Sequence, residues 1–135
     1  MDYVNPDREN FERFKALPRD TPMHLLNMIR YRERAAYPDG HPCAGLDRTG
    51  EQAFAEYLRL VVPFIERLGG GIVWQGACEG VITGPRDFEW DMVFVMGFPD
   101  AAAFLALVTD PDYKATVVDH RTAGVQDSRL VRYRP

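Results

Sequence analysis

Residues 110–133, DPDYKATVVDHRTAGVQDSRLVRY, decide the fold because they carry a helix start, a helix stop and a closing strand. Asp110 followed by Pro111 is a helix-opening signal, since the carboxylate caps free N–H groups and proline lacks the N–H that would stay unpaired. Gly124 predicts the end of that helix. Residues 128–133 then predict the last strand of the chain.

The same kinds of signal, followed back towards the start of the chain, predict three more strands and three more helices. Thr49 begins the longest helix, Gln52 completes a capping box, and Pro63 is expected to kink that helix. The expected elements before residue 110 are a leading helix within residues 5–17, strand 23–31, helix 49–68, strand 72–83, strand 90–98 and helix 99–108. After the leading helix, this order is typical of the ferredoxin-like βαββαβ sandwich, an α+β fold with an antiparallel sheet and two helices on one face.

Composition narrows the class of protein. With 135 residues, 46% hydrophobic and 27% charged, the chain is expected to form one globular domain, residues 1–135, with residues 1–20 as an N-terminal helical extension. A net charge of −4 argues against a nucleic-acid partner. The longest apolar run, residues 101–108, is too short to cross a membrane. Cys43 and Cys78 form no disulfide framework, and no signal peptide is visible, so a cytoplasmic location is expected.

The strands are apolar on both faces, which predicts a homodimer. Leu25 and Ile29 lie on one face of the first strand, whereas Leu26 and Met28 lie on the other. Two helices cover only one face of such a sheet. A second copy of the chain is the simplest cover for the other face, because closed homodimers are the commonest oligomers.

Three segments resemble the bacterial DUF1330 family of unknown function: ALPRDTPMHLLNMIRYRERAAYPDG (16–40), WDMVFVMGFPDAAAFLALVTDPDY (90–113) and HRTAGVQDSRLVR (120–132). The resemblance implies a ferredoxin-like monomer that dimerises into an α+β barrel. More distant barrels of this kind include antibiotic-biosynthesis-type monooxygenases, muconolactone isomerases, dye-decolourising peroxidases and ligand-binding domains of some transcription regulators. Because these activities differ widely, the architecture assigns none of them.

Three residues are the catalytic candidates for a pocket expected between sheet and helices. His120 would transfer a proton, Arg30 would stabilise an oxyanion, and Tyr57 would orient a substrate. Each has a structural alternative. A cation such as His120 is favoured in the last turn of a helix, Arg30 suits a surface ion pair, and Tyr57 suits the core.

Five further residues are ligand-binding candidates: Asn27, Trp74, Asp91, Tyr113 and Arg121. The Asn27 amide needs hydrogen-bond partners from protein or ligand. Trp74 is expected to share a face with small residues, which indicates either a hollow or the close approach of a helix. Asp91 at a strand start suits either an orienting role or a solvated position.

No metal or cofactor is expected, because His41 and Cys43 provide too few ligands and no nucleotide fingerprint is present. Three functions stay open. The first is a cofactor-independent enzyme, monooxygenase-like or isomerase-like, for an aromatic or enolisable compound. The second is a non-catalytic module that binds a small molecule, and the third is a dimeric interaction scaffold. The loop over residues 32–50 is expected to act either as a lid or as a clasp on the partner.

Overall fold

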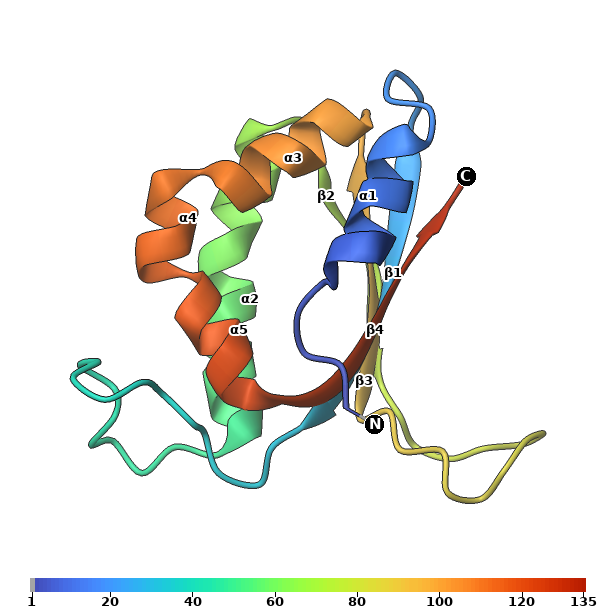
Figure 1. Ribbon diagram of the computed structural model, residues 1–135. Helices are drawn as coiled ribbons and strands as arrows, with labels where there is room; N and C mark the ends of the chain where they lie inside the picture. Colours follow the sequence, from blue (N-terminus) through green and yellow to red (C-terminus); the bar gives the residue numbers. More distant parts are fainter. Residues whose placement is uncertain (1) are drawn as a thin grey trace.

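Four antiparallel strands form one sheet, with helices on one of its faces (Figure 1). The computed structural model describes residues 2–135. Its elements are α1 (Arg8–Ala16), β1 (Met23–Tyr31), α2 (Gly50–Arg67), β2 (Gly71–Ala77), β3 (Met92–Phe98), α3 (Ala101–Thr109), α4 (Pro111–Thr116), α5 (Val118–Gly124) and β4 (Val125–Tyr133). The strand order β2-β3-β1-β4 confirms the ferredoxin-like plan.

The predicted N-caps are present at the starts of α2 and α4. The Thr49 hydroxyl accepts from the backbone N–H of Gln52 at 3.1 Å, and the Gln52 side chain accepts from the N–H of Thr49 at 2.9 Å. Pro63 lies inside α2, which continues to Arg67. Asp110 caps α4, but the predicted single helix is divided into α4 and α5 at Val117.

Several boundaries differ from the expected ones. β2 ends at Ala77 rather than at residue 83, because residues 78–91 form an exposed loop whose base is closed by the Cys78 N–H and the Asp91 carbonyl. β4 begins three residues earlier than predicted, at Val125, because that residue already pairs with β1. β3 begins at Met92 rather than at residue 90. α1 begins only at Arg8, since Asp7 is its N-cap.

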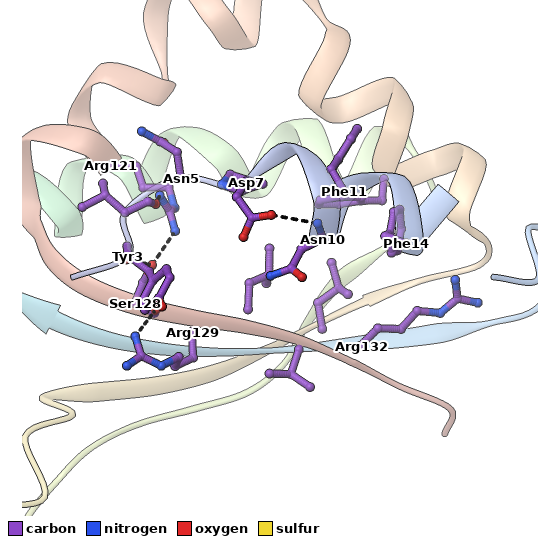
Figure 2. Close-up of a pocket in the computed structure, with 16 residues that line it drawn as sticks. Tyr3, Asn5, Asp7, Asn10, Phe11, Phe14, Arg121, Ser128, Arg129 and Arg132 are labelled. Atoms are coloured by element: carbon purple, nitrogen blue, oxygen red, sulfur yellow. Dashed lines mark hydrogen bonds between the residues drawn. The ribbon is translucent and has the colours of Figure 1, made fainter. Parts of the chain in front are cut away.

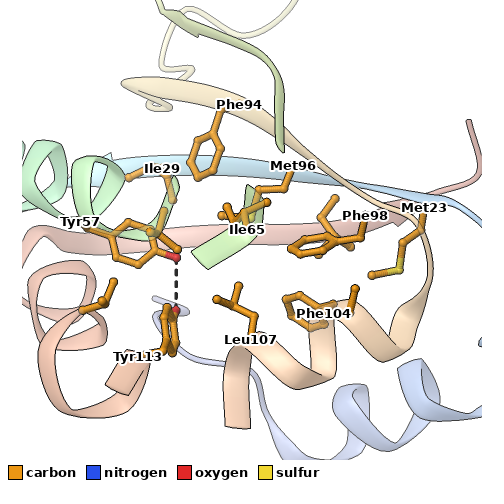
Figure 3. Packing of buried hydrophobic residues seen from close by; sticks show 14 of the residues in the cluster. Met23, Ile29, Tyr57, Ile65, Phe94, Met96, Phe98, Phe104, Leu107 and Tyr113 are labelled. Atoms are coloured by element: carbon orange, nitrogen blue, oxygen red, sulfur yellow. Dashed lines mark hydrogen bonds between the residues drawn. The ribbon is translucent and has the colours of Figure 1, made fainter. Parts of the chain in front are cut away.

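The core lies between the sheet and α2–α5 (Figure 3). In β1, Leu25, Asn27 and Ile29 face the helices and are buried, whereas Leu26 and Met28 point to the opposite face and are only half-buried. The alternation inferred from the sequence is therefore confirmed, and one face of the sheet is left without helices. No helix within residues 2–135 is long and apolar enough to span a bilayer.

Candidate functional site

An N-terminal strap, residues 2–7, lies against β4 and α5. The backbone N–H of Tyr3 donates to the Asp127 carboxylate at 2.7 Å, and the Ser128 hydroxyl donates to the Tyr3 carbonyl at 2.7 Å. The Arg121 guanidinium donates to the carbonyl of Val4 at 2.6 Å. These bonds fix the strap over the edge of the sheet, where α1 follows it (Figure 1).

Two adjoining hollows lie under the strap and α1. The first, which we call the strap cleft, has a volume of about 610 Å3 and lies between the strap, α1 and β4 (Figure 2). The second, which we call the tyrosine cavity, has a volume of about 520 Å3 and extends to the helices α3, α4 and α5. Asn5, Phe11, Phe104, Arg121 and Leu130 line both. Such volumes are in the range that accommodates small molecules.

Polar side chains from several elements line the tyrosine cavity, and two of them meet in a hydrogen bond. The hydroxyls of Tyr57 and Tyr113 lie 3.2 Å apart (Figure 3). One of the two donates to the other, so the second proton is left for another acceptor. The Asn27 side chain, which also lines the cavity, donates to the Leu25 carbonyl at 3.1 Å through Nδ2 and retains further amide capacity. Leu107 and other apolar side chains form the remaining wall.

Burial favours the protonated form of Tyr57. Desolvation raises the pKa of Tyr57 well above its ordinary value, and the neighbouring Tyr113 raises that pKa further, whereas the positive charge of Arg121 acts in the opposite direction. At neutral pH, the Tyr57 hydroxyl is therefore protonated and can donate a hydrogen bond, and Arg121 lines the same cavity.

The spacing within α5 explains why Arg121 reaches the cavity. Val118 and Arg121 are three positions apart on α5 and both line the cavity, and Lys114 reaches it from the preceding helix α4. His120 is one position away, which is about 100° around the helix. It therefore faces the loop over residues 32–49 instead.

His120 belongs to a separate aromatic and polar cluster. Its Nδ1 lies 2.7 Å from the Tyr37 hydroxyl, and its ring packs edge-on against His41 at 5.6 Å between centroids. Arg48 donates to the Tyr37 hydroxyl at 3.4 Å. Burial lowers the pKa of His120 below its ordinary value, and this exceeds the opposite influence of Glu56. The expected convergence of His120 with Arg121 in one pocket is wrong, and its proton-transfer role stays a prediction.

Arg30 lies on the opposite face of the sheet from the cavity. Its guanidinium pairs with Asp2 at 3.1 Å, with Asp127 at 3.2 Å and with Glu89. The guanidinium of Arg30 is therefore engaged in ion pairs, which agrees with the structural alternative given for this residue. Asp91 closes the end of the sheet, where its carboxylate accepts from the backbone N–H of Tyr31 at 2.8 Å. Both residues lie outside the two hollows, and the roles predicted for them stay predictions.

Trp74 also lies on the face of the sheet that has no helices. A bulge between Ile72 and Trp74 shifts the register, so that Ile72 pairs with Met96 but Trp74 pairs with Val95. Val95 points away from the helices, and Trp74 is 56% exposed. Both alternatives expected for Trp74, a hollow and the close approach of a helix, are therefore wrong, because no helix covers this face. The ring instead lies over Gly76, where a Cβ would stand 2.9 Å from it.

The structure thus brings together Asn27, Tyr57, Tyr113 and Arg121 from the predicted set. Sequence reasoning missed the strap and the cationic residues Arg8 and Lys114. Lys114 lies in the same predicted helical segment as Arg121, but the break at Val117 puts the two residues on separate helices, and nothing local marked the strap. Within residues 2–135, no group of three or more His, Cys, Asp or Glu side chains is arranged to hold a metal ion.

A family model described as a domain of unknown function, DUF1330, matches residues 43–133. The matched region runs from the loop before α2 to the end of β4, so it includes Tyr57, Tyr113 and Arg121. A comparison with curated proteins finds no match.

Solved structures of unknown function are similar over the whole chain. The RPA0582 protein of Rhodopseudomonas palustris is 44% identical, with 100% of this chain and 98% of that chain covered and a TM-score of 0.88. Methylated RPA0582 is 46% identical, with 99% and 95% covered and a TM-score of 0.88. A dabb family protein with a ferredoxin-like fold from Mesorhizobium loti is 16% identical, with 84% and 96% covered and a TM-score of 0.51, which shows the fold alone.

Proposed function

This chain belongs to the DUF1330 family, and from that premise we propose that it binds a small, mostly apolar molecule in the tyrosine cavity. The observation that carries the proposal is the make-up of the cavity. About 520 Å3 of space has mainly apolar walls, and Asn27, Tyr57, Tyr113 and Arg121 are among the polar residues that line it. Binding sites for small molecules combine apolar walls with a few placed polar groups in this way.

The polar groups specify an acceptor oxygen on the ligand. The Tyr57–Tyr113 pair retains one O–H to donate, because only one of its protons lies between the two oxygens. Arg121 adds further N–H donors beside it. A carbonyl, phenolate or carboxylate oxygen satisfies these donors, whereas a hydrocarbon leaves the donors without an acceptor, which costs binding free energy.

Filling the cavity tests this proposal. Leu130 lines the cavity and is 39% exposed, so Leu130→Trp inserts a ring without removing a core residue. We expect the neutral fluorescent probe 1-N-phenylnaphthylamine to bind the unaltered chain saturably, and Leu130→Trp to weaken binding about tenfold. Leu46→Trp, in an exposed loop, is the control and leaves binding unchanged. Equal affinity in both variants would place the probe elsewhere and contradict the proposal.

A second candidate function is cofactor-independent catalysis on an enolisable compound. The hydroxyl pair beside Arg121 favours it, because donors fixed near a cation stabilise an oxyanion as it develops. The carboxylate among the cavity-lining residues is Asp7, which makes it a nearer proton acceptor than His120. Solvent-deuterium exchange at the methylene of phenylpyruvate, measured by NMR, tests this. We expect exchange faster than in buffer, slowed by Tyr57→Phe and unaffected by His120→Ala. Exchange at the buffer rate would reject catalysis on this substrate and leave binding untouched.

We also propose that a second copy of the chain covers the helix-free face of the sheet. Val93 and Val95 of β3, with Leu26 and Met28 of β1, present a continuous apolar surface there. Trp74, brought to the same face by the bulge in β2, extends it. Apolar patches of this kind mark protein interfaces, and an identical patch on a second copy is self-complementary.

A further inference from the structure

The tyrosine cavity is cationic although the chain as a whole is acidic. Arg8, Lys114 and Arg121 line it, against the single carboxylate of Asp7 among its lining residues. The chain carries a net charge of −4. Moreover, the Asp7 carboxylate already accepts from the N–H of Asn10 as the cap of α1. The cavity therefore has a local potential opposite in sign to that of the molecule, which attracts anions.

Arg121 carries a positive charge that no carboxylate neutralises within residues 2–135. Its guanidinium donates to the Val4 carbonyl at 2.6 Å and reaches the Ser128 hydroxyl at 3.4 Å, and both of these partners are uncharged. Arg30 and Arg129, which lie nearby on the opposite face of the sheet, each pair with the Asp127 carboxylate. A guanidinium has five N–H donors, so Arg121 retains donors beyond those two contacts.

The position of Arg121 makes an anionic partner favourable. The residue is half-buried between the strap and β4, where an unpaired charge is less well hydrated than at the surface. Its charge also reaches the hydroxyl of Tyr57, which forms the floor of the cavity with Tyr113. A carboxylate placed there accepts from the guanidinium and from the free tyrosine O–H together.

We propose that the ligand of the tyrosine cavity is a carboxylic acid with an apolar body, bound as its anion. This inference rests on the proposed function of the cavity and names the class of molecule that it takes. The carboxylate binds between Arg121 and the tyrosine pair, and Lys114 and Arg8 attract it electrostatically. The apolar body packs against the wall formed by Phe104, Leu107 and Leu130.

A matched pair of probes isolates the charge. 4-Phenylbutyrate and 4-phenylbutyramide share one apolar body, and each competes with 1-N-phenylnaphthylamine in a fluorescence titration. We expect the unaltered chain to bind the acid at least about tenfold more tightly than the amide, which is the size of effect that a charge-assisted hydrogen bond produces. Lowering the pH below the pKa of the acid, or adding salt, reduces the preference.

Substitutions assign the preference to particular residues. Arg121→Gln keeps a donor for the Val4 carbonyl but removes the charge, so it should weaken acid binding more than amide binding and reduce the preference to about twofold, whereas Arg121→Lys retains part of the preference. Lys114→Gln is at an exposed position that does not affect folding, and it should weaken acid binding about twofold to threefold. Arg134→Gln removes an exposed charge outside the lining residues and is the matched control.

The outcomes separate this inference from the proposed function. Equal binding of acid and amide overturns the anionic ligand but leaves the cavity as a binding site. A preference that survives Arg121→Gln unchanged overturns the role of Arg121. If neither 4-phenylbutyrate nor 4-phenylbutyramide displaces a bound 1-N-phenylnaphthylamine, the inference fails while the proposed function stands. If 1-N-phenylnaphthylamine itself does not bind, both fail.

Discussion

At the scale of single residues, the buried Tyr57–Tyr113 pair is a polar element inside an apolar core. The two hydroxyls share one hydrogen bond across 3.2 Å. Their contribution to stability and to binding is separable, because removing one hydroxyl leaves the other without its partner, whereas removing both leaves an apolar contact. The pair is therefore suited to a double-mutant cycle.

We predict that Tyr113→Phe lowers the free energy of unfolding by about 1 kcal/mol, because the Tyr57 hydroxyl is then buried without its partner. The double variant Tyr57→Phe/Tyr113→Phe should cost less than the sum of the two single changes. Urea denaturation of the four proteins measures this coupling. Strictly additive costs would show that the two hydroxyls do not stabilise each other.

A second prediction at this scale concerns His120. Because burial lowers its pKa in the folded chain, the unfolded chain takes up the proton first as the pH falls. The free energy of unfolding should therefore decrease from about pH 6.5 downward, towards the lower pKa of the folded state. His120→Gln, which does not titrate, should reduce this slope, while Tyr37→Phe keeps it. Parallel pH profiles for His120→Gln and the unaltered chain would contradict this assignment.

At the scale of elements, the direction in which a side chain points was harder to predict than the element itself. The helical segment that contains α5 was anticipated from its signals, though not its division from α4, and His120 and Arg121 were expected in one pocket although neighbouring helical positions diverge by about 100°. Trp74 and Gly76 share one face of β2 as predicted, but the bulge after Ile72 turns that face away from the helices. A bulge depends on pairing with another strand, so no local pattern in β2 reveals it.

The packing of α5 against α2 sets the position of Arg121. The two helices approach each other closely at Gly124 because this residue has no side chain. A Cβ at Gly124 would lie 2.6 Å from the carbonyl oxygen of Gly50 and 2.9 Å from the backbone nitrogen of Phe54. Backbone atoms of a helix do not yield readily, so we predict that Gly124→Ala lowers the free energy of unfolding by about 1–3 kcal/mol.

Gly45→Ala provides the control for this prediction, because nothing lies within 4 Å of the added Cβ. Thermal unfolding followed by circular dichroism compares the two variants. An unchanged midpoint for Gly124→Ala would mean that α5 moves away from α2 without cost. In that event, the geometry of Arg121 would not depend on this contact.

At the scale of the whole molecule, local patterns carried most of the fold. Capping signals, apolar periodicity and turns located four strands in the right order, and the apolar pattern separated the two faces of β1 without showing which one packs on the helices. The strap was missed for a physical reason. Tyr3 is placed by a hydrogen bond to Asp127, 124 positions away, and the segment has no periodicity of its own. The sequence therefore predicted Asn27, Tyr57, Tyr113 and Arg121 as site residues, but it did not predict the strap that covers the site.

The helix-free face gives the last prediction. Val95 lies there, paired with Trp74 on one side and Leu26 on the other, and its side chain does not enter the core. If two copies meet through this face, Val95→Lys places a charge in an apolar interface once in each copy, which costs desolvation and repulsion together. We expect light scattering to give twice the 15.4 kDa mass of one chain for the unaltered protein, and the mass of one chain for Val95→Lys. Ala102→Lys, at an exposed position of α3, should remain dimeric. If the unaltered protein has the mass of one chain at micromolar concentration, a second copy does not cover this face. If Val95→Lys is still a dimer, the two copies meet through another face.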